Sequence, residues 1–531
     1  MKKFINKIKN NKVLSILSVL IIGLFFILVT RITYAYLAPV INDAQTNVVG
    51  STDTVDDFKF ELGNPLKINA TPTTLKENGS NYTISTTAKA LLKANSTKKT
   101  ATFNYFVYFQ IASNSFTYSD GSTPEIILTV TDPNGDEITS IDGLTYGTFN
   151  GVSGFDITIK KGLFNIANNH EITSNSSTSY TTQSWTIKIT YLNLSIDQST
   201  NFGNSMKVNV YITKNEKKPT LADVCSSEQT LSSCIIAMDG KDDTLYHHTS
   251  SLANGAGDNS YRYAGASDKV NNFVCFGSTT SPCPTDNLYR IIGVIDGKVK
   301  LIKYDYATNA LLGTNGDYKD ARTPDSRYKG SLSKVDVYYW NYKNNTSINN
   351  GWGSNEWSTS LLNKINLNTN YLNNIGTTWS NLIEDTTWKV SGHSTGSVTP
   401  SEMYTAEITN ATKTYGPSDG TSKIGLMYAS DYGFAASPSA WTKNLTIYNG
   451  NDANGISITT INWMYMGYFE WTISHNSSLS YSVFSLSGIG YVTYYNANNG
   501  YGSRPVLYLK SSALYAGGFG TKNSPITLVV W

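Results

Sequence analysis

Hydrophobic and polar residues alternate with a period of two in several segments between residues 36 and 217. The clearest are residues 104–110 (NYFVYFQ), 184–191 (SWTIKITY) and 206–212 (MKVNVYI). Because side chains two positions apart share one face of a strand, this alternation predicts half-buried β-strands. Asn134-Gly135, after residues 125–130 (EIILTV), predicts a tight hairpin turn. Strands separated by Ser, Thr, Asn and Gly together predict an all-β sandwich over residues 36–217.

Strand and helix patterns are mixed in residues 261–531. Residues 290–306 (RIIGVIDGKVKLIKYDY) place Asp296-Gly297 between two apolar runs, which predicts a hairpin with a type I′ turn. Residues 354–366 predict a helix and residues 379–383 a shorter helical turn, whereas residues 424–428 predict a short buried strand. The apolar positions at helical spacing in the first of these segments are Trp357, Leu361, Leu362 and Ile365.

The longest uncharged apolar run is residues 13–30, whose 18 residues are at the lower limit for spanning a bilayer. Five lysines precede it, which predicts a cytoplasmic N-terminus. Thr33 and Ala35 are small residues at the positions that a signal peptidase reads, so cleavage after Ala35 is expected, with an uncleaved signal anchor as the alternative. Both interpretations place the chain beyond residue 36 outside the cell.

Residues 218–260 predict a linker between the two domains, with a short helix within residues 221–238 and a Gly- and Asn-rich loop over 249–260. All four cysteines lie between residues 225 and 283. Proximity in the sequence favours the pairs Cys225–Cys234 and Cys275–Cys283, although four cysteines allow three pairings. Oxidation is the expected state outside the cell, and neither pair has the spacing of a zinc site.

Composition agrees with an extracellular β-rich protein. Only 15% of the residues are charged, about a tenth are Asn, and there are 36 tyrosines. The net charge is +2, but residues 1–35 hold six basic residues and no acid, so the remainder has 35 basic against 39 acidic residues, a net −4. A nucleic-acid partner is not expected, because it would require a basic face.

The junction Thr33-Tyr34-Ala35-Tyr36-Leu37, followed by Phe58-Lys59-Phe60-Glu61-Leu62, resembles the start of the TasA/camelysin-type surface proteins of low-GC Gram-positive bacteria. Leu37 stands where that family usually has Phe. The resemblance implies processing by a dedicated signal peptidase and a β-sandwich that acts as a stalk or assembly module. Residues 184–212 are also similar to the last strands of that family.

Four segments of the second half, in order, resemble the formylglycine-generating-enzyme and C-type-lectin-like superfamily. These are residues 287–293 (NLYRIIG), 426–433 (LMYASDYG), 470–474 (EWTIS) and 502–507 (GSRPVL). The resemblance implies an α+β C-type-lectin-like domain with long irregular connections over residues 261–531. Such domains usually bind ligands, and only some are enzymes.

Candidate catalytic residues are few. The formylglycine-generating enzymes use cysteines in their C-terminal half, and no cysteine follows Cys283. A Ser-His-Asp triad could be drawn from Ser474, His475 and Asp431, and a glycosidase pair from Glu356, Glu384, Asp385 and Glu470, but no motif marks either set. Trp471 is expected in the core with Glu470 at an edge, and Arg504 in a buried ion pair or as a donor to a carbonyl. No catalytic residue, cofactor or metal ion is therefore predicted.

Residues 463–501 combine rigid aromatic side chains with Ser, Asn and Gly, the composition of recognition surfaces. The alternative is an ordinary aromatic core crossed by Asn-Gly turns. The predicted ligand-contacting residues are Trp463, Tyr481, Tyr491, Tyr494, Tyr495, Asn498 and Tyr501.

The sequence thus predicts a signal segment (1–35), a β-sandwich (36–217), a linker (218–260) and a lectin-like domain (261–531). The expected function is that of a non-catalytic extracellular surface protein, which binds a glycan, protein or matrix component through its C-terminal domain. One alternative is a structural biofilm-matrix protein that self-associates into fibres through the sandwich, and another is a secreted hydrolase. Membrane contact through residues 13–30 is expected where the signal is not cleaved.

Overall fold

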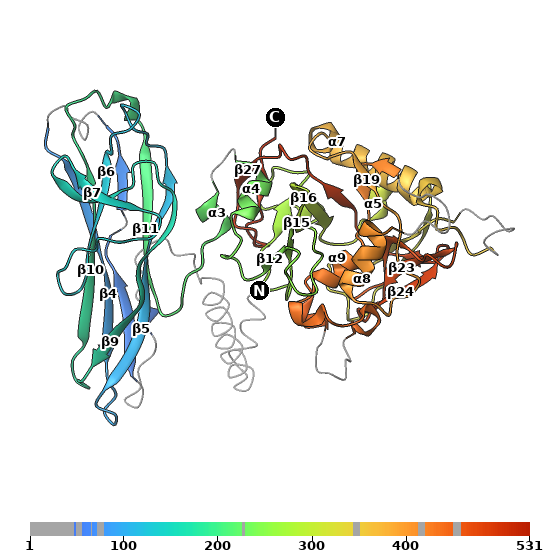
Figure 1. Ribbon diagram of the computed structural model, residues 1–531, viewed down its shortest axis with the longest axis horizontal. Coiled ribbons are helices and arrows are strands. Elements are labelled where there is room, and N and C mark those ends of the chain that lie inside the picture. Colours follow the sequence, from blue (N-terminus) through green and yellow to red (C-terminus); the bar gives the residue numbers. More distant parts are fainter. Residues whose placement is uncertain are drawn as a thin grey trace, which may run out of the picture. The chain divides into compact units, whose positions relative to one another are not determined.

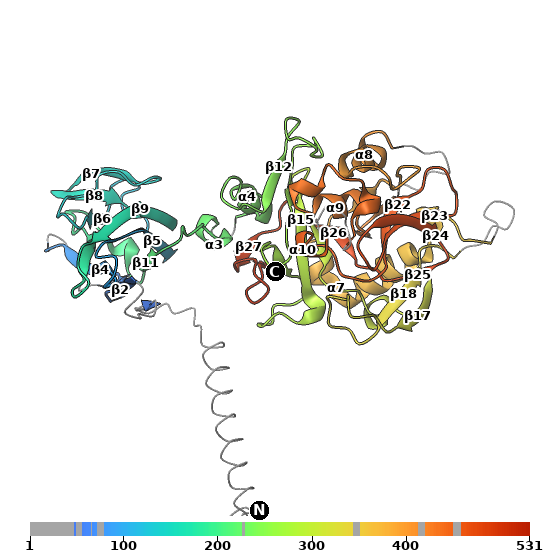
Figure 2. The same ribbon diagram turned by 90° about the horizontal axis from the view of Figure 1, so that it is seen from below.

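The computed structural model describes residues 47–48, 56–64, 66–71, 79–225, 229–342, 351–411, 420–449 and 458–530. Within these ranges most of the regular structure is β-sheet, which confirms the predicted β-rich character. The chain divides into an N-terminal unit, Met1–Lys217, and a C-terminal unit, Lys218–Trp531. Figure 1 shows both units, and Figure 2 shows them turned by 90°.

The N-terminal unit consists of two antiparallel sheets (Figure 1). The seven-stranded sheet has the order β1 (Asn47–Val48), β2 (Asp57–Leu62), β4 (Tyr82–Lys93), β10 (Thr181–Tyr191), β6 (Ile126–Thr131), β8 (Val152–Asp156) and β7 (Thr145–Phe149). The four-stranded sheet has the order β3 (Leu66–Asn69), β11 (Ser205–Thr213), β5 (Ala101–Asn114) and β9 (Gly162–Ser174).

The alternating residues of these strands form one core. In β10, Trp185, Ile187 and Ile189 are buried, and in β5 Val107 and Phe109 are buried. All five belong to the same apolar cluster, to which both sheets contribute. Two sheets around one core are the arrangement expected of a β-sandwich.

The predicted turn at Asn134-Gly135 is present. Gly135 has a positive φ of 93°, and the carbonyl of Asp132 accepts its N–H (3.1 Å). The chain then returns to β6, where Ile138 N–H donates to the Val130 carbonyl (2.9 Å). The side chain of Asp132 accepts the N–H groups of Asn134 and Asp136, so it stabilises the turn itself.

The predicted signal segment, residues 13–30, and the cleavage position after Ala35 lie outside the described residues. Among the helices of the described ranges, none has both the length and the apolar character needed to cross a membrane.

The main sheet of the C-terminal unit has the order β12 (Leu245–His248), β13 (Ser260–Tyr263), β15 (Leu288–Ile295), β16 (Lys298–Lys303), β26 (Val506–Tyr508) and β21 (Ile424–Gly425), with β14 (Phe273–Cys275) paired to β15. Two smaller sheets have three strands each: β17 (Tyr318–Arg322), β18 (Val335–Tyr339) and β25 (Gly500–Tyr501) form one, and β22 (Glu470–His475), β23 (Ser482–Leu486) and β24 (Val492–Asn496) form the other. Two further sheets have two strands each: β19 (Thr386–Trp388) pairs with β20 (Gly420–Ser422), and β27 (Tyr515–Gly517) pairs with β28 (Thr527–Leu528).

Short helices connect these strands. The α-helices are α3 (Leu221–Val224), α4 (Leu231–Ile236), α5 (Asn309–Leu312), α7 (Leu372–Ser380), α8 (Pro400–Tyr404), α9 (Ala429–Phe434) and α10 (Ile458–Ile461). The 3₁₀-helices of this unit are η2 (Thr285–Asn287), η3 (Trp357–Thr359), η6 (Pro438–Ala440) and η7 (Leu445–Ile447), and η4 (Leu362–Tyr371) and η5 (Thr405–Thr409) are π-helical.

The predicted hairpin at residues 290–306 is confirmed. β15 and β16 pair antiparallel, and Ile295 lies opposite Lys298. Asp296 and Gly297 between them have positive φ values of 50° and 72°, as a type I′ turn requires. The predicted strand at 424–428 is the buried β21, although it extends only over Ile424–Gly425.

Residues 218–260, predicted as a linker, form part of the C-terminal unit. Leu231 and Ile235 of α4 are fully buried in its core, and β12 continues the main sheet. The short helix expected within residues 221–238 is present as α3 and α4, but α4 packs into the core of the C-terminal unit instead of lying in a linker.

The predicted helix at 354–366 also differs. Trp357–Thr359 forms a 3₁₀ turn, and the longer helix starts at Leu362 and continues through η4 into α7, where Gly376, with φ 78° and ψ 166°, interrupts it. The carboxylate of Asp317 accepts the N–H groups of Leu361 and Leu362 (3.0 Å each), so a residue far away in the sequence sets this start. The turn predicted at 379–383 overlaps the short helical segment that follows this interruption and ends at Ser380.

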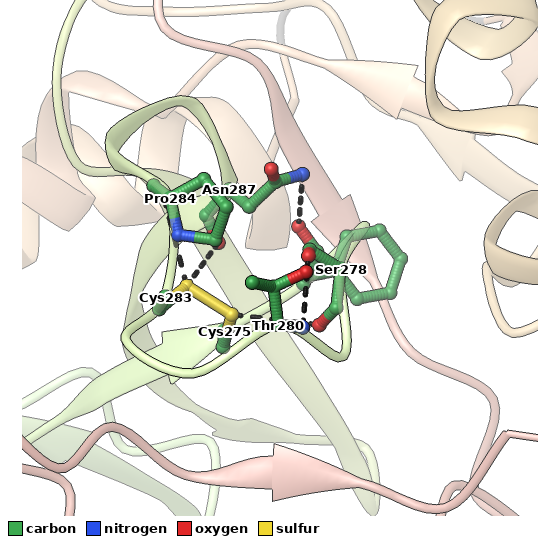
Figure 3. The surroundings of a disulfide bond; sticks show 7 residues. Cys275, Ser278, Thr280, Cys283, Pro284 and Asn287 are labelled. Carbon is green, nitrogen blue, oxygen red and sulfur yellow. Dashed lines mark hydrogen bonds between the residues drawn. A yellow bond between two sulfur atoms is a disulfide. The ribbon is translucent and has the colours of Figure 1, made fainter.

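Both predicted disulfides are present. Cys225 bonds to Cys234 and Cys275 to Cys283, with Cα–Cα distances of 5.2 and 5.8 Å. Figure 3 shows the second bond beside Asn287, whose side-chain amide donates to the Phe276 carbonyl (3.1 Å). Disulfides are the expected state in an oxidising, extracellular environment.

Candidate functional site

A hollow of about 390 Å³ in the C-terminal unit combines buried charges with aromatic walls, and we call it the charged pocket. Strands β13, β16 and β26, helices α8 and α9 and strand β19 all contribute to it. Its lining residues are Asp258, Arg262, Ile295, Asp296, Lys298, Lys300, Asp385, Thr386, Thr387, Trp388, Lys389, Tyr404, Ile408, Tyr428, Asp431 and Tyr508.

Strand register brings the deepest of these residues together. Lys300 of β16 is the antiparallel partner of Tyr508 in β26, so both side chains leave the sheet on the same face. Asp431 lies in the first turn of α9, where its carboxylate accepts the Tyr428 N–H (2.9 Å). The segments 290–306 and 426–433 therefore meet at the floor of the charged pocket.

The floor is a network of paired charges. The carboxylate of Asp431 accepts hydrogen bonds from Lys300 Nζ (2.6 Å) and from an Arg262 N–H (3.1 Å). Arg262 also donates to Asp258 (2.8 Å), which accepts the Tyr404 hydroxyl (2.8 Å). Lys300, Arg262 and Asp431 are each no more than 2% exposed. Such charges are stable in the interior only because each one has an oppositely charged partner.

The pKa values of these groups follow from burial and pairing. Burial alone would raise the pKa of Asp258, but the Arg262 guanidinium and hydrogen bonds from Ser260, Arg262 and Tyr404 hold it well below its usual range. Burial lowers the pKa of the Lys300 ammonium, and the carboxylate of Asp431 opposes that shift. The floor thus carries two cations and two carboxylates in contact.

Aromatic rings enclose the ammonium group of Lys300. Its Nζ lies 4.5 Å from the centre of the Tyr428 ring, 5.3 Å from that of Tyr508 and 6.0 Å from that of Trp388. The rings attract the cation through their negative faces. They also present apolar walls beside the polar floor, the combination found in most small-molecule pockets.

A further acid, Glu407 of η5, lies behind the floor and is fully buried. Its carboxylate accepts the hydroxyl groups of Ser430 and Ser474 and the N–H of Ala429 (3.1 Å). Burial raises its pKa from the ordinary 4.5 to about 7, against the opposing effect of the two serine hydroxyls.

The candidate triad residues have other partners. The single hydroxyl proton of Ser474 is donated to Glu407, and both carboxylate oxygens of Asp431 are bonded to Arg262 and Lys300. His475, also buried, follows Ser474 in β22. These contacts differ from those of a Ser-His-Asp triad, in which the serine donates to the histidine and the aspartate accepts from it.

The four candidate glycosidase carboxylates do not form one cluster of free acids. Glu384 pairs with Lys298 (2.7 Å), Asp385 with Lys423 (3.7 Å) and Glu470 with Arg504 (2.7 Å). Glu356 accepts the Ser358 hydroxyl (3.2 Å). The prediction of a buried ion pair for Arg504 is confirmed, and Trp471 is buried as expected.

Three of the predicted ligand-contacting tyrosines lie together. Burial and the neighbouring Tyr491 hydroxyl raise the pKa of Tyr495, and the Tyr495 and Tyr501 ring centres are 5.5 Å apart. The ring of Phe469, which was not predicted, stacks on Tyr501 (5.1 Å). We call these four residues the tyrosine cluster. Tyr491 and Tyr495 are half-buried, whereas Tyr501 is 9% exposed.

The other four predicted residues lie apart from the tyrosine cluster. The ring centres of Tyr481 and Trp352 are 4.7 Å apart, and the side-chain amide of Asn498 donates to the Gly351 carbonyl (3.1 Å). Tyr494 neighbours Tyr495 in β24, so it faces the opposite side of the strand, and it is 37% exposed.

Trp463 is only 2% exposed. Its indole N–H donates to the Tyr263 carbonyl (2.8 Å), and its ring packs on Arg290 (4.6 Å). This burial is a correction to its predicted place at a binding surface, and the reason is that its polar atom and its ring face both have partners in the core.

The charged pocket was not predicted from the sequence, although Asp431 and Asp385 were candidates for other roles. Arg262 stands in no motif. Lys300 alternates with Val299 and Leu301, which by itself predicts a solvent-facing lysine. The only signal was the segment 426–433, whose polar residues Tyr428 and Asp431 prove to lie at the floor.

No protein-family model, no curated protein and no solved structure matches this chain. The two family resemblances noted in the sequence therefore stay predictions. Within the described ranges, no group of three or more His, Cys, Asp or Glu side chains is placed to hold a metal ion.

Proposed function

We propose that the protein is a non-catalytic binding protein of the cell exterior, and that its C-terminal unit captures a ligand in the charged pocket. The observation that carries this proposal is the pocket itself: a hollow of about 390 Å³ with a floor of compensated charges and aromatic walls. Small-molecule pockets have volumes of roughly 300–1,000 Å³ and combine apolar walls with a few fixed polar groups.

The partners of the polar groups support binding rather than turnover. Asp431, Arg262 and Lys300 neutralise one another, and Ser474 is bonded to Glu407. A nucleophile must reach the bound ligand, whereas Ser474 is fully buried and does not line the charged pocket. The paired charged side chains of the floor instead offer a ligand hydrogen-bond donors and acceptors in fixed positions, and the aromatic walls offer it stacking faces.

The expected ligand is a glycan, protein or matrix component, in keeping with the C-type-lectin-like α+β domain that the sequence motifs resemble. A pocket near the lower end of the usual range encloses only a small part of such a ligand. The two disulfides support an extracellular location. The N-terminal unit would serve as stalk or assembly module.

A steric block tests the proposal. Thr387 lines the charged pocket with an exposed side chain, so Thr387→Trp should fill the opening without disturbing the buried network. The full-length protein and this variant are compared on a glycan array and on immobilised extracellular proteins. We expect at least one ligand whose binding is weakened tenfold or more by Thr387→Trp.

Thr377→Trp is the matched control, because Thr377 is exposed on α7 and does not line the pocket. Its binding should equal that of the wild type. Ligands that bind equally to all three proteins would place the recognition surface elsewhere, with the tyrosine cluster as the next site to vary.

A further inference from the structure

The acid behind the pocket floor is connected directly to the residues that form the floor. Glu407 accepts the N–H of Ala429 and the hydroxyl of Ser430, which open α9, and Asp431 follows in the same turn. The hydroxyl of Ser474 reaches it from β22. The position of α9, and of the carboxylate that holds Lys300 and Arg262, therefore depends on the contacts of Glu407.

The lining of the charged pocket is balanced in charge. Four carboxylates face four cations, which are Asp258, Asp296, Asp385 and Asp431 against Arg262, Lys298, Lys300 and Lys389. Glu407 is not part of the lining. Its ionisation therefore adds one negative charge that no lining residue compensates.

The charged and titratable groups around Glu407 come from three segments. Asp431 of α9 repels its negative charge, and Lys300 of β16 attracts it. Burial raises the pKa of the Tyr428 hydroxyl, and the negative charge of Glu407 adds to that rise. Because the group is buried, little solvent screens these interactions. Burial also raises the pKa of Glu407 to about 7, so the charge changes within the range met outside cells.

We propose that Glu407 sets the charge of the pocket and thereby the class of ligand it accepts. With Glu407 protonated, the pocket is neutral. It then binds an anionic ligand about as tightly as the neutral analogue of that ligand. With Glu407 ionised, the pocket carries one extra negative charge and discriminates against anions. This inference deepens the proposed function, on which its ligand-binding part rests.

The titration is tested by stability. A carboxyl group whose pKa is higher in the folded than in the unfolded chain stabilises the fold at low pH, and this stability is lost as the pH rises from about 4.5 to about 7. The melting temperature of the wild type should therefore fall between pH 5 and pH 8. In Glu407→Gln, which keeps the shape of the protonated acid, that fall should disappear.

Two further variants make this result specific. Glu356→Gln changes a half-buried glutamate of the same unit and should keep the wild-type pH dependence. Ser430→Ala removes one hydroxyl donor from the carboxylate and should move the titration to higher pH. A fall that persists in Glu407→Gln would assign it to another group and would overturn the proposal.

Selectivity is tested with two probes on one sugar ring, methyl glucoside (neutral) and glucuronate (anionic), by saturation-transfer NMR at pH 5.5 and 8.5. The ratio of glucuronate to glucoside binding should drop several-fold with rising pH in the wild type and stay constant in Glu407→Gln. An equal drop in both proteins, or none in the wild type, contradicts the proposal. If neither probe binds but the melting temperatures depend on pH as expected, the titration of Glu407 stands and the result counts against the proposed function instead.

Discussion

Buried cations are a recurring feature of the C-terminal unit at the scale of single residues. Their partners differ from one to the next. Arg504 pairs with Glu470, and Lys300 and Arg262 share Asp431. Arg290 instead lies between the rings of Phe273 and Trp463 (4.3 and 4.6 Å) and donates to neutral oxygens, so burial lowers its pKa to about 9.

Arg504→Met should destabilise the C-terminal unit strongly. It leaves the Glu470 carboxylate buried without its cation, and the loss of one partner of a buried pair costs about 3–5 kcal/mol. Nine of the ten tryptophans lie beyond residue 217, so denaturation followed by tryptophan fluorescence measures this unit.

The control is Arg327→Met, which removes half of an ion pair with Asp325 in which both side chains are 49% exposed. Exposed pairs contribute about 1 kcal/mol or less. The double variant Arg504→Met with Glu470→Met should recover part of the loss. If Arg504→Met and Arg327→Met lower the free energy of unfolding equally, the buried Arg504–Glu470 pair contributes no more than an exposed pair.

At the scale of elements, the β15–β16 hairpin depends on two residues with positive φ. Gly297→Ala should destabilise it by about 1–2 kcal/mol, because a Cβ is unfavourable in the left-handed region even though no atom lies within 4 Å of it. Gly420→Ala has equal space and a backbone without positive φ, so it should be nearly neutral. Equal unfolding midpoints for the two variants would contradict this explanation.

Local patterns predict the elements that depend on local contacts. Alternation located β5, β10 and β11, and Asp296-Gly297 located a hairpin, because side-chain period and turn geometry act within a few residues. The start of the helix at Leu362 depends on Asp317, which lies 45 residues earlier. Nothing within the window of a helical pattern contains that information.

The candidate site was predictable only in part for the same reason. The tyrosines of β24 are placed by one strand, and three of the seven predicted residues do come together. Lys300 is the opposite case. Its alternation with Val299 and Leu301 predicts exposure, yet α9 covers it with Asp431 and leaves it 1% exposed. Which face of a strand is covered is decided by tertiary packing.

At the scale of the whole molecule, the division after Lys217 predicts where the chain is open to proteases. Lys214, Asn215 and Glu216 are exposed after the end of β11, whereas α4 and β12 pack into the C-terminal unit. Limited trypsin digestion should therefore cut after Lys214 or Lys217 and release two stable fragments, which mass spectrometry identifies. A first cut after Lys241 would show that residues 218–260 behave as the linker that the sequence predicts.

The two disulfides close loops of only nine and eight residues in sequence separation. An extended chain gains about 3.4 Å per residue, so together these bonds withhold about 50 Å of contour length, against about 1,000 Å in the C-terminal unit as a whole. If the chain is pulled from its two ends, the C-terminal unit can extend to nearly its full contour length before a disulfide limits the extension. Its resistance to force therefore rests on the hydrogen bonds of its sheets and on its packed core, not on covalent cross-links.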